Sequence, residues 1–162
     1  SNTLDKVNDH YLQINSDYIG CVDDTCLATG ELLAVKDTPF DFNKRKRIGQ
    51  DLEADHIQLK NAFGYDHSFV LNGTENQLTL EEPVSGRRLI ISTTAPVIQV
   101  YTGNFLKDGC IGKAGRVYEN REGVALETQL MPNAINTEEN PSTILRKGDK
   151  FESNTKYVFE IM

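Results

Sequence analysis

Several residue types that would place a chain in a class at once are scarce or missing here. The 162 residues include no tryptophan and only three cysteines, Cys21, Cys26 and Cys110. An odd and low number of cysteines excludes a small disulfide scaffold, so we expect free thiols in a reducing compartment, the cytoplasm. A metal site at Cys21 and Cys26 would need further ligands, but His10 is the only histidine nearby. We therefore predict no metal.

Long apolar runs and excess positive charge are also lacking. No segment approaches the roughly 18 apolar residues of a membrane-spanning helix, so we expect no membrane partner. Asp and Glu outnumber Lys and Arg by 24 to 17, which gives a net charge of -7 and disfavours binding to nucleic acid. The basic run 44–47 stands without interleaved aromatic residues, and we interpret it as a solvated loop or helix start. This balance favours a neutral small molecule as the ligand.

What the sequence does contain is a succession of short apolar or alternating runs, separated by glycine, asparagine, aspartate and proline. This pattern is typical of an all-β protein, and the run lengths fit a multi-stranded antiparallel sandwich. The helical candidate is 48–57, because Ile48 and Leu52 have helical spacing. The strands are predicted at residues 10–15, 31–35, 68–71, 77–81, 88–93, 97–102, 124–130 and 156–161.

Three polar residues interrupt these strand patterns, and the most informative is Glu127. It lies in the middle of the predicted strand 124–130. Burying an unpaired carboxylate costs several kcal/mol, so Glu127 is exposed, paired or functional. A structural role would pair it with an arginine, and the candidates are Arg87, Arg88 and Arg116.

Asp66 and Gln99 each have a structural and a functional interpretation. Asp66 precedes the predicted strand 68–71, where an aspartate often bonds its own backbone in a turn. Gln99 lies in the predicted strand 97–102 with apolar residues on both faces, so its amide needs a partner within the sheet or on a ligand. The residues alone leave both alternatives open.

These positions fall within a series of short motifs along nearly the whole chain. The motifs are 27–31, 38–42, Gly64-Tyr65-Asp66-His67-Ser68-Phe69, 85–87, 96–105, Leu126-Glu127-Thr128-Gln129 with 132–136, and 141–148. In these motifs and in their order, the chain resembles the C-terminal half of the aldose 1-epimerases, the galactose mutarotase family.

The resemblance implies an antiparallel β-supersandwich, of which residues 1–162 would be the C-terminal half of a single domain. It implies an enzyme that interconverts the α and β anomers of free hexoses such as galactose or glucose, without metal or organic cofactor. Phe69 or Tyr101 would pack on the apolar face of the sugar ring. The chain would then act on a small-molecule hexose.

The resemblance also implies roles for particular residues. Glu127 would be the general base, because it is the glutamate of the Leu-Glu-Thr-Gln motif. Asp66 and Gln99 would bind sugar hydroxyls. His67 matches the motif that contains Asp66, but we assign it no catalytic role.

The chain departs from the family in one respect. The family's general acid is a histidine in an Asn-His-Ser/Thr-Tyr-Phe-Asn segment, which the resemblance places upstream of Ser1. We therefore expect the N-terminal half of the protein as a partner, either as a second chain or as sequence outside these residues. Two alternatives remain: a non-catalytic carbohydrate-binding β-sandwich, or a relative acting on hexose 6-phosphates, which would need arginines or lysines that converge on the phosphate.

Overall fold

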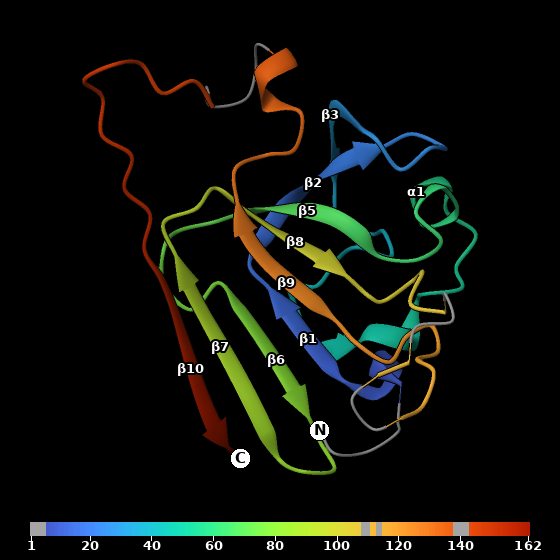
Figure 1. Ribbon diagram of the computed structural model, residues 1–162. Helices are drawn as coiled ribbons and strands as arrows, with labels where there is room; N and C mark the ends of the chain where they lie inside the picture. The colour runs from blue at the N-terminus through green and yellow to red at the C-terminus, as the bar shows by residue number, and fades with distance from the viewer. Residues whose placement is uncertain (1–5, 108–110, 113–114, 138–142) are drawn as a thin grey trace.

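Two antiparallel five-stranded sheets packed face to face make up the chain (Figure 1). The computed structural model describes residues 6–107, 111–112, 115–137 and 143–162, so Cys110 and the motif residues 141–142 lie outside the described part. The all-β antiparallel fold predicted from the sequence is confirmed. No helix in the described part is long and apolar enough to cross a membrane.

Sheet A has the strand order β10-β7-β6-β1-β4, and sheet B has the order β3-β2-β5-β8-β9. Short 3-10 turns, labelled η, and one short α-helix lie between the strands. The elements in chain order are η1 (Val7–Asp9), β1 (Tyr11–Ile14), β2 (Ser16–Val22), β3 (Ala28–Ala34), β4 (Lys46–Arg47), η2 (Ile48–Gln50), α1 (Ile57–Asn61), β5 (Asp66–Leu71), β6 (Leu78–Glu82), β7 (Arg87–Thr93), β8 (Val97–Tyr101), β9 (Ala125–Gln129), η3 (Ala134–Asn136) and β10 (Thr155–Ile161).

Every strand predicted from the sequence is present with shifted ends, whereas β2 and β4 were not predicted. The alternation in β2 is broken, because the adjacent residues Ile19 and Gly20 are both buried. The pairing of β2 with β3 also shifts register between Gly20 and Val22. A strand with such an irregularity lacks the period of two on which the prediction depends.

The helix predicted at 48–57 is wrong. Ile48 and Leu52 are both buried, but they lie in a 3-10 turn and a following turn that pack on the core. The α-helix α1 begins only at Ile57, where the backbone N–H of Gln58 donates to Nδ1 of His56 at 3.2 Å. The spacing of two apolar residues therefore reflected their common burial and not a helix.

The core lies between the two sheets, and its removal from water is the main stabilising contribution. Phe42 makes edge-to-face contacts with Tyr65 and Phe69, at centroid distances of 5.2 Å and 6.0 Å. The fully or nearly fully buried apolar residues of this core include Leu12, Ile14, Ile19, Phe40, Phe42, Ile48, Tyr65, Phe69, Leu78, Ile91, Ile98 and Val100.

The apolar face of sheet A continues past this core onto β10, which lies at the edge of the sheet beside β7 (Figure 1). Tyr157 is paired with the core residue Ile91, so its side chain lies on the core-facing side of the sheet. Phe159 and Ile161 follow on that same side, and they are 79% and 74% exposed. We call Tyr157, Phe159 and Ile161 the β10 stripe.

Candidate functional site

The face of sheet B that points away from the core carries all three residues singled out from the sequence. Gln99 on β8 lies directly opposite Glu127 on β9 and, on its other side, opposite Ser68 on β5. Asp66 comes two residues before Ser68 on β5, so its side chain lies on the same face. The structure thus brings Asp66, Gln99 and Glu127 together on three neighbouring strands.

Asp66 and Gln99 are joined by a hydrogen bond. Nε2 of Gln99 donates to Oδ1 of Asp66 at 2.7 Å. The hydroxyl of Ser68 donates to Oε1 of Gln99. Asp66 is the first residue of β5, and its side chain is hydrogen-bonded to the neighbouring strand β8. It does not have the turn role that its position in the sequence also allowed.

Asp66 and Glu127 differ in their surroundings. Partial burial raises the pKa of Asp66, and the hydrogen bond from Gln99 opposes that rise. Glu127 is exposed. Within the described residues, it forms no ion pair with the arginines that a structural role would require. Arg88 binds Glu81 at 2.9 Å instead, and Arg116 binds Glu122 at 2.8 Å.

A small cavity of about 70 Å³ lies beside Asp66 and Gln99. Ligand pockets usually enclose about 300 Å³ or more, so this cavity is one part of a wall and not a complete sugar site. None of the described residues that line it is a lysine or an arginine. The other lining residues are Gly20, Val22, Cys26, Ala28, Ser68, Met131 and Pro132.

His67 belongs to the same motif as Asp66 but points into the core. It is fully buried, and burial lowers its pKa to about 3, so the imidazole is neutral. Its Nδ1 accepts from the backbone N–H of Asp66 at 3.1 Å, which leaves the ring proton on Nε2 to face Oε1 of Gln58 at 3.2 Å. Its role is therefore structural.

The two aromatic residues expected to contact the sugar lie on opposite faces of sheet B. Phe69 is fully buried in the core, so the expectation that it packs on a ligand is wrong. Tyr101 pairs with Asp66 and shares its face. The Tyr101 hydroxyl accepts from the backbone N–H of Phe105 at 2.9 Å, which fixes the ring at the end of β8.

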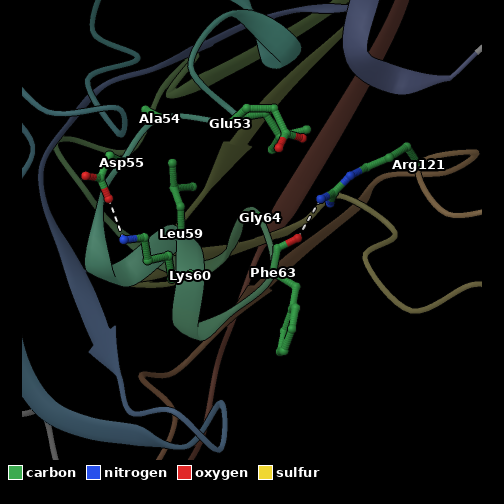
Figure 2. Close-up of a pocket in the computed structure, with 9 residues that line it drawn as sticks. Glu53, Ala54, Asp55, Leu59, Lys60, Phe63, Gly64 and Arg121 are labelled. Atoms are coloured by element: carbon green, nitrogen blue, oxygen red, sulfur yellow. Dashed lines mark hydrogen bonds and ion pairs between the residues drawn. The ribbon is translucent and has the colours of Figure 1, made fainter.

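A larger cavity, of about 540 Å³, contains none of the three residues (Figure 2). It is lined by Arg121, by residues of α1 and by the turns on either side of that helix. Lys60 and Asp55 form an ion pair at its rim. Figure 2 shows Arg121 reaching across towards the carbonyl of Phe63, which accepts a hydrogen bond from Nη2 at 2.5 Å.

Arg121 connects the ends of the three strands that carry the site, a role that the sequence analysis missed. Phe63 comes shortly before β5. Nη1 of Arg121 also donates to Oγ1 of Thr102 at 3.1 Å and to Oδ1 of Asn104, just after β8. Arg121 itself lies shortly before β9, and its N–H donates to the carbonyl of Gly103 at 2.9 Å. The guanidinium therefore supports the mutual placement of β5, β8 and β9.

The part of the chain that the structure describes contains no cluster of metal ligands. No group of three or more histidine, cysteine, aspartate or glutamate side chains there lies in an arrangement that could hold a metal ion. Cys21 and Cys26 are both free thiols.

The sequence is similar to a known protein family over almost its whole length. The sequence profile of the aldose 1-epimerase family matches residues 1–158. The chain is 37% identical to galactose mutarotase of Homo sapiens over 159 residues, which cover 96% of the chain and 45% of the relative. It is 35% identical to aldose 1-epimerase of Escherichia coli, covering 94% of the chain and 45% of the relative.

Solved structures agree with the sequence comparisons. The crystal structure of a GalM/aldose epimerase homologue from C. elegans has a TM-score of 0.86 and 31% identity, covering 96% of this chain and 47% of that one. Galactose 1-epimerase from Lactobacillus acidophilus has a TM-score of 0.74 and 31% identity, covering 96% and 45%. The chain thus spans about half the length of the relatives that it matches.

Proposed function

Because this chain belongs to the aldose 1-epimerase family, we propose that the protein interconverts the α and β anomers of free hexoses such as galactose or glucose. One observation carries the proposal most directly. Gln99 lies opposite Glu127 and is bonded to Asp66 on its other side. A carboxylate able to act as a base and two groups able to bind hydroxyls therefore face the same space.

In the proposed reaction, Glu127 removes the proton from the C1 hydroxyl of the cyclic sugar while an acid protonates the ring oxygen. The C1 carbonyl forms, the bond from C1 to the ring oxygen breaks, and the ring opens to the aldehyde. Rotation about the C1–C2 bond presents the other face of the carbonyl. The reverse proton transfers then close the ring. Asp66 and Gln99 hold the other hydroxyls and so determine which carbon meets Glu127.

The acid in this scheme would come from the N-terminal half of the protein, the partner that we propose for this chain. The three histidines of the chain lie elsewhere. His67 faces the core, His56 caps α1, and His10 follows η1 in front of β1 of sheet A. The face with Glu127 thus carries a base and binding groups without a histidine beside them.

We also propose that the protein acts in a reducing compartment such as the cytoplasm. Cys21 and Cys26 are free, although they lie close together in the sequence. Free and partly exposed thiols oxidise readily in secreted proteins, whereas cytoplasmic reductants keep them reduced. The two thiols support this location.

Polarimetry on the whole protein with freshly dissolved α-galactose tests the function. The parent protein should accelerate the approach to the anomeric equilibrium, and Glu127→Gln should reduce kcat by about 10² to 10⁴. Glu152→Gln, at an exposed position paired with Lys150, is the matched control and should keep the parent rate. A Glu127→Gln rate equal to that of the parent would exclude this base. Sugar binding without any acceleration would favour the carbohydrate-binding alternative.

A further inference from the structure

Ser68 is a polar residue on the same face of sheet B, and the proposed reaction gives it no role. Its side chain lies on the same face as Asp66, directly opposite Gln99. It is 3% exposed and lines the cavity beside both residues. A buried hydroxyl normally has a hydrogen-bond partner, and the partner here is Oε1 of Gln99.

The directions of the hydrogen bonds follow from the chemistry of the three groups. The ionised carboxylate of Asp66 only accepts, so the carboxamide of Gln99 must turn its nitrogen towards it. The carboxamide oxygen then faces Ser68, and the serine hydroxyl has to donate. In this arrangement, one N–H of Gln99 and the second oxygen of Asp66 remain for a ligand. Ser68 closes the chain of bonds at the end away from Asp66.

We propose that Ser68 is a positioning residue for sugar binding, which holds the Gln99 carboxamide so that its second N–H and the second oxygen of Asp66 face the substrate. This inference rests on the proposed function. The side-chain hydrogen bond that the structure describes for Ser68 is to Gln99, so Ser68 acts on the sugar through the orientation of that carboxamide.

The consequence for kinetics is specific. Without the Ser68 hydroxyl, Oε1 of Gln99 loses its hydrogen-bond partner and the carboxamide can rotate more freely. Its hydrogen bonds to the sugar hydroxyls are then weaker. A hydrogen bond of this kind is equivalent to about a three- to tenfold change in affinity. Ser68→Ala should therefore raise the KM for the sugar by that factor. The value of kcat should stay within about twofold, because the contact of Ser68 is not with the proposed base.

A double-mutant cycle on the whole protein separates this role from general destabilisation. Ser68→Ala, Gln99→Ala and the double variant are compared by polarimetry over a range of galactose concentrations. If Ser68 acts through Gln99, then Ser68→Ala raises KM in the parent and has no further effect once Gln99 is alanine. The control is Ser92→Ala on β7. Ser92 is also buried, and its hydroxyl accepts from the backbone N–H of Asn76 at 2.9 Å.

Ser92→Ala should lower the melting temperature without changing KM. An unchanged KM in Ser68→Ala, a loss confined to kcat, or the same rise in KM in the Gln99→Ala background would each overturn the proposal. These results leave the proposed function standing, because they need an active parent protein. An inactive parent would instead contradict the proposed function itself.

Discussion

The guanidinium of Arg121 occupies the space into which a side chain at Gly64 would project. A Cβ atom built on Gly64 would lie 2.5 Å from Nη1 of Arg121, and the φ angle of Gly64 is +136°. Both the close approach and the backbone angle therefore require glycine at the start of the Gly64-Tyr65-Asp66-His67 motif. A residue that looks like part of a substrate-binding motif is fixed here by a contact with a distant arginine.

Replacing Gly64 tests this relationship. Gly64→Ala should lower the free energy of unfolding by about 2–4 kcal/mol, because backbone strain adds to the displacement of a bonded guanidinium. Gly73→Ala is the matched control, since Gly73 has a φ angle of +72° and no atom within 4 Å of a built Cβ. It should cost only about 1 kcal/mol. Denaturant unfolding of the whole protein measures both, and equal losses would show that the Arg121 contact is unimportant.

Removing Arg121 itself should have a wider effect. Arg121→Ala removes the donor of the Phe63 carbonyl and one of the two donors of Oδ1 of Asn104, which keeps the bond from the Thr102 hydroxyl. We expect a loss of about 2–4 kcal/mol in unfolding free energy, together with a lower kcat/KM because the ends of β5, β8 and β9 lose a common contact. Arg146→Ala, at an exposed position, should change neither quantity. If stability falls while kcat/KM stays at the parent value, Arg121 supports the fold alone.

The face on which Glu127 and Gln99 lie was predictable from the sequence, because side chains alternate strictly along a strand. Alternation along the predicted strands places Glu127 on the face opposite Leu126 and Thr128, and Gln99 on the face opposite Ile98 and Val100. Local pattern sufficed there, since each assignment depends only on neighbouring residues.

The contacts that organise the site were not predictable in this way. Arg121 and Phe63 are 58 positions apart, and Ser68 and Gln99 are 31 apart. Such contacts depend on which strands become neighbours and in which register, and no single segment contains that information. The resemblance to a family implied binding roles for Asp66 and Gln99, but neither the supporting serine nor the arginine stood out in the sequence.

His67 should make the folded state sensitive to acid. Its pKa is about 3 in the folded state, against an ordinary value of 6.5, because burial and the nearby His56 disfavour the charged ring. Below about pH 6.5 the unfolded chain therefore binds a proton that the folded chain does not. The contribution of His67 to the free energy of unfolding has its full value above about pH 6.5. It falls by about 1 kcal/mol per pH unit as the pH is lowered from there.

Denaturant unfolding of the whole protein between pH 7.5 and pH 5 checks the His67 prediction. The variant His67→Gln lowers stability at every pH, but its dependence on pH should be clearly weaker than that of the parent. The comparison uses slopes, so the expected loss of overall stability does not obscure the result. Parallel curves for the two proteins would refute the assignment.

Sugar affinity should weaken in acid through Asp66. Burial raises the pKa of this carboxyl, so it takes up a proton at a higher pH than an ordinary aspartate, whose value is 3.8. Protonation removes the negative charge of Asp66 and converts one acceptor oxygen into a donor. The hydrogen bonds from Gln99 and from the sugar become weaker, so KM rises as the pH falls. Cys26, Tyr101 and Glu127 also face this region, so the comparison needs Asp66→Asn. That variant should have a higher KM at neutral pH and little further rise in acid; an acid dependence like the parent's would assign the titration to another group.

The β10 stripe should make the isolated 162-residue chain associate. Tyr157, Phe159 and Ile161 are 46%, 79% and 74% exposed on the core-facing side of an edge strand, a surface that soluble monomers usually cover. We expect oligomers in size-exclusion chromatography, and we expect them to convert to a defined complex when the proposed N-terminal half is co-expressed. Phe159→Ser should reduce the self-association of the isolated chain and weaken that complex.

The control is Val84→Ser in the β6–β7 turn. Val84 is also apolar and is 78% exposed, and its replacement should change neither the self-association nor the complex. If the isolated chain is a soluble monomer that unfolds cooperatively, the proposal that a partner covers the β10 stripe is wrong.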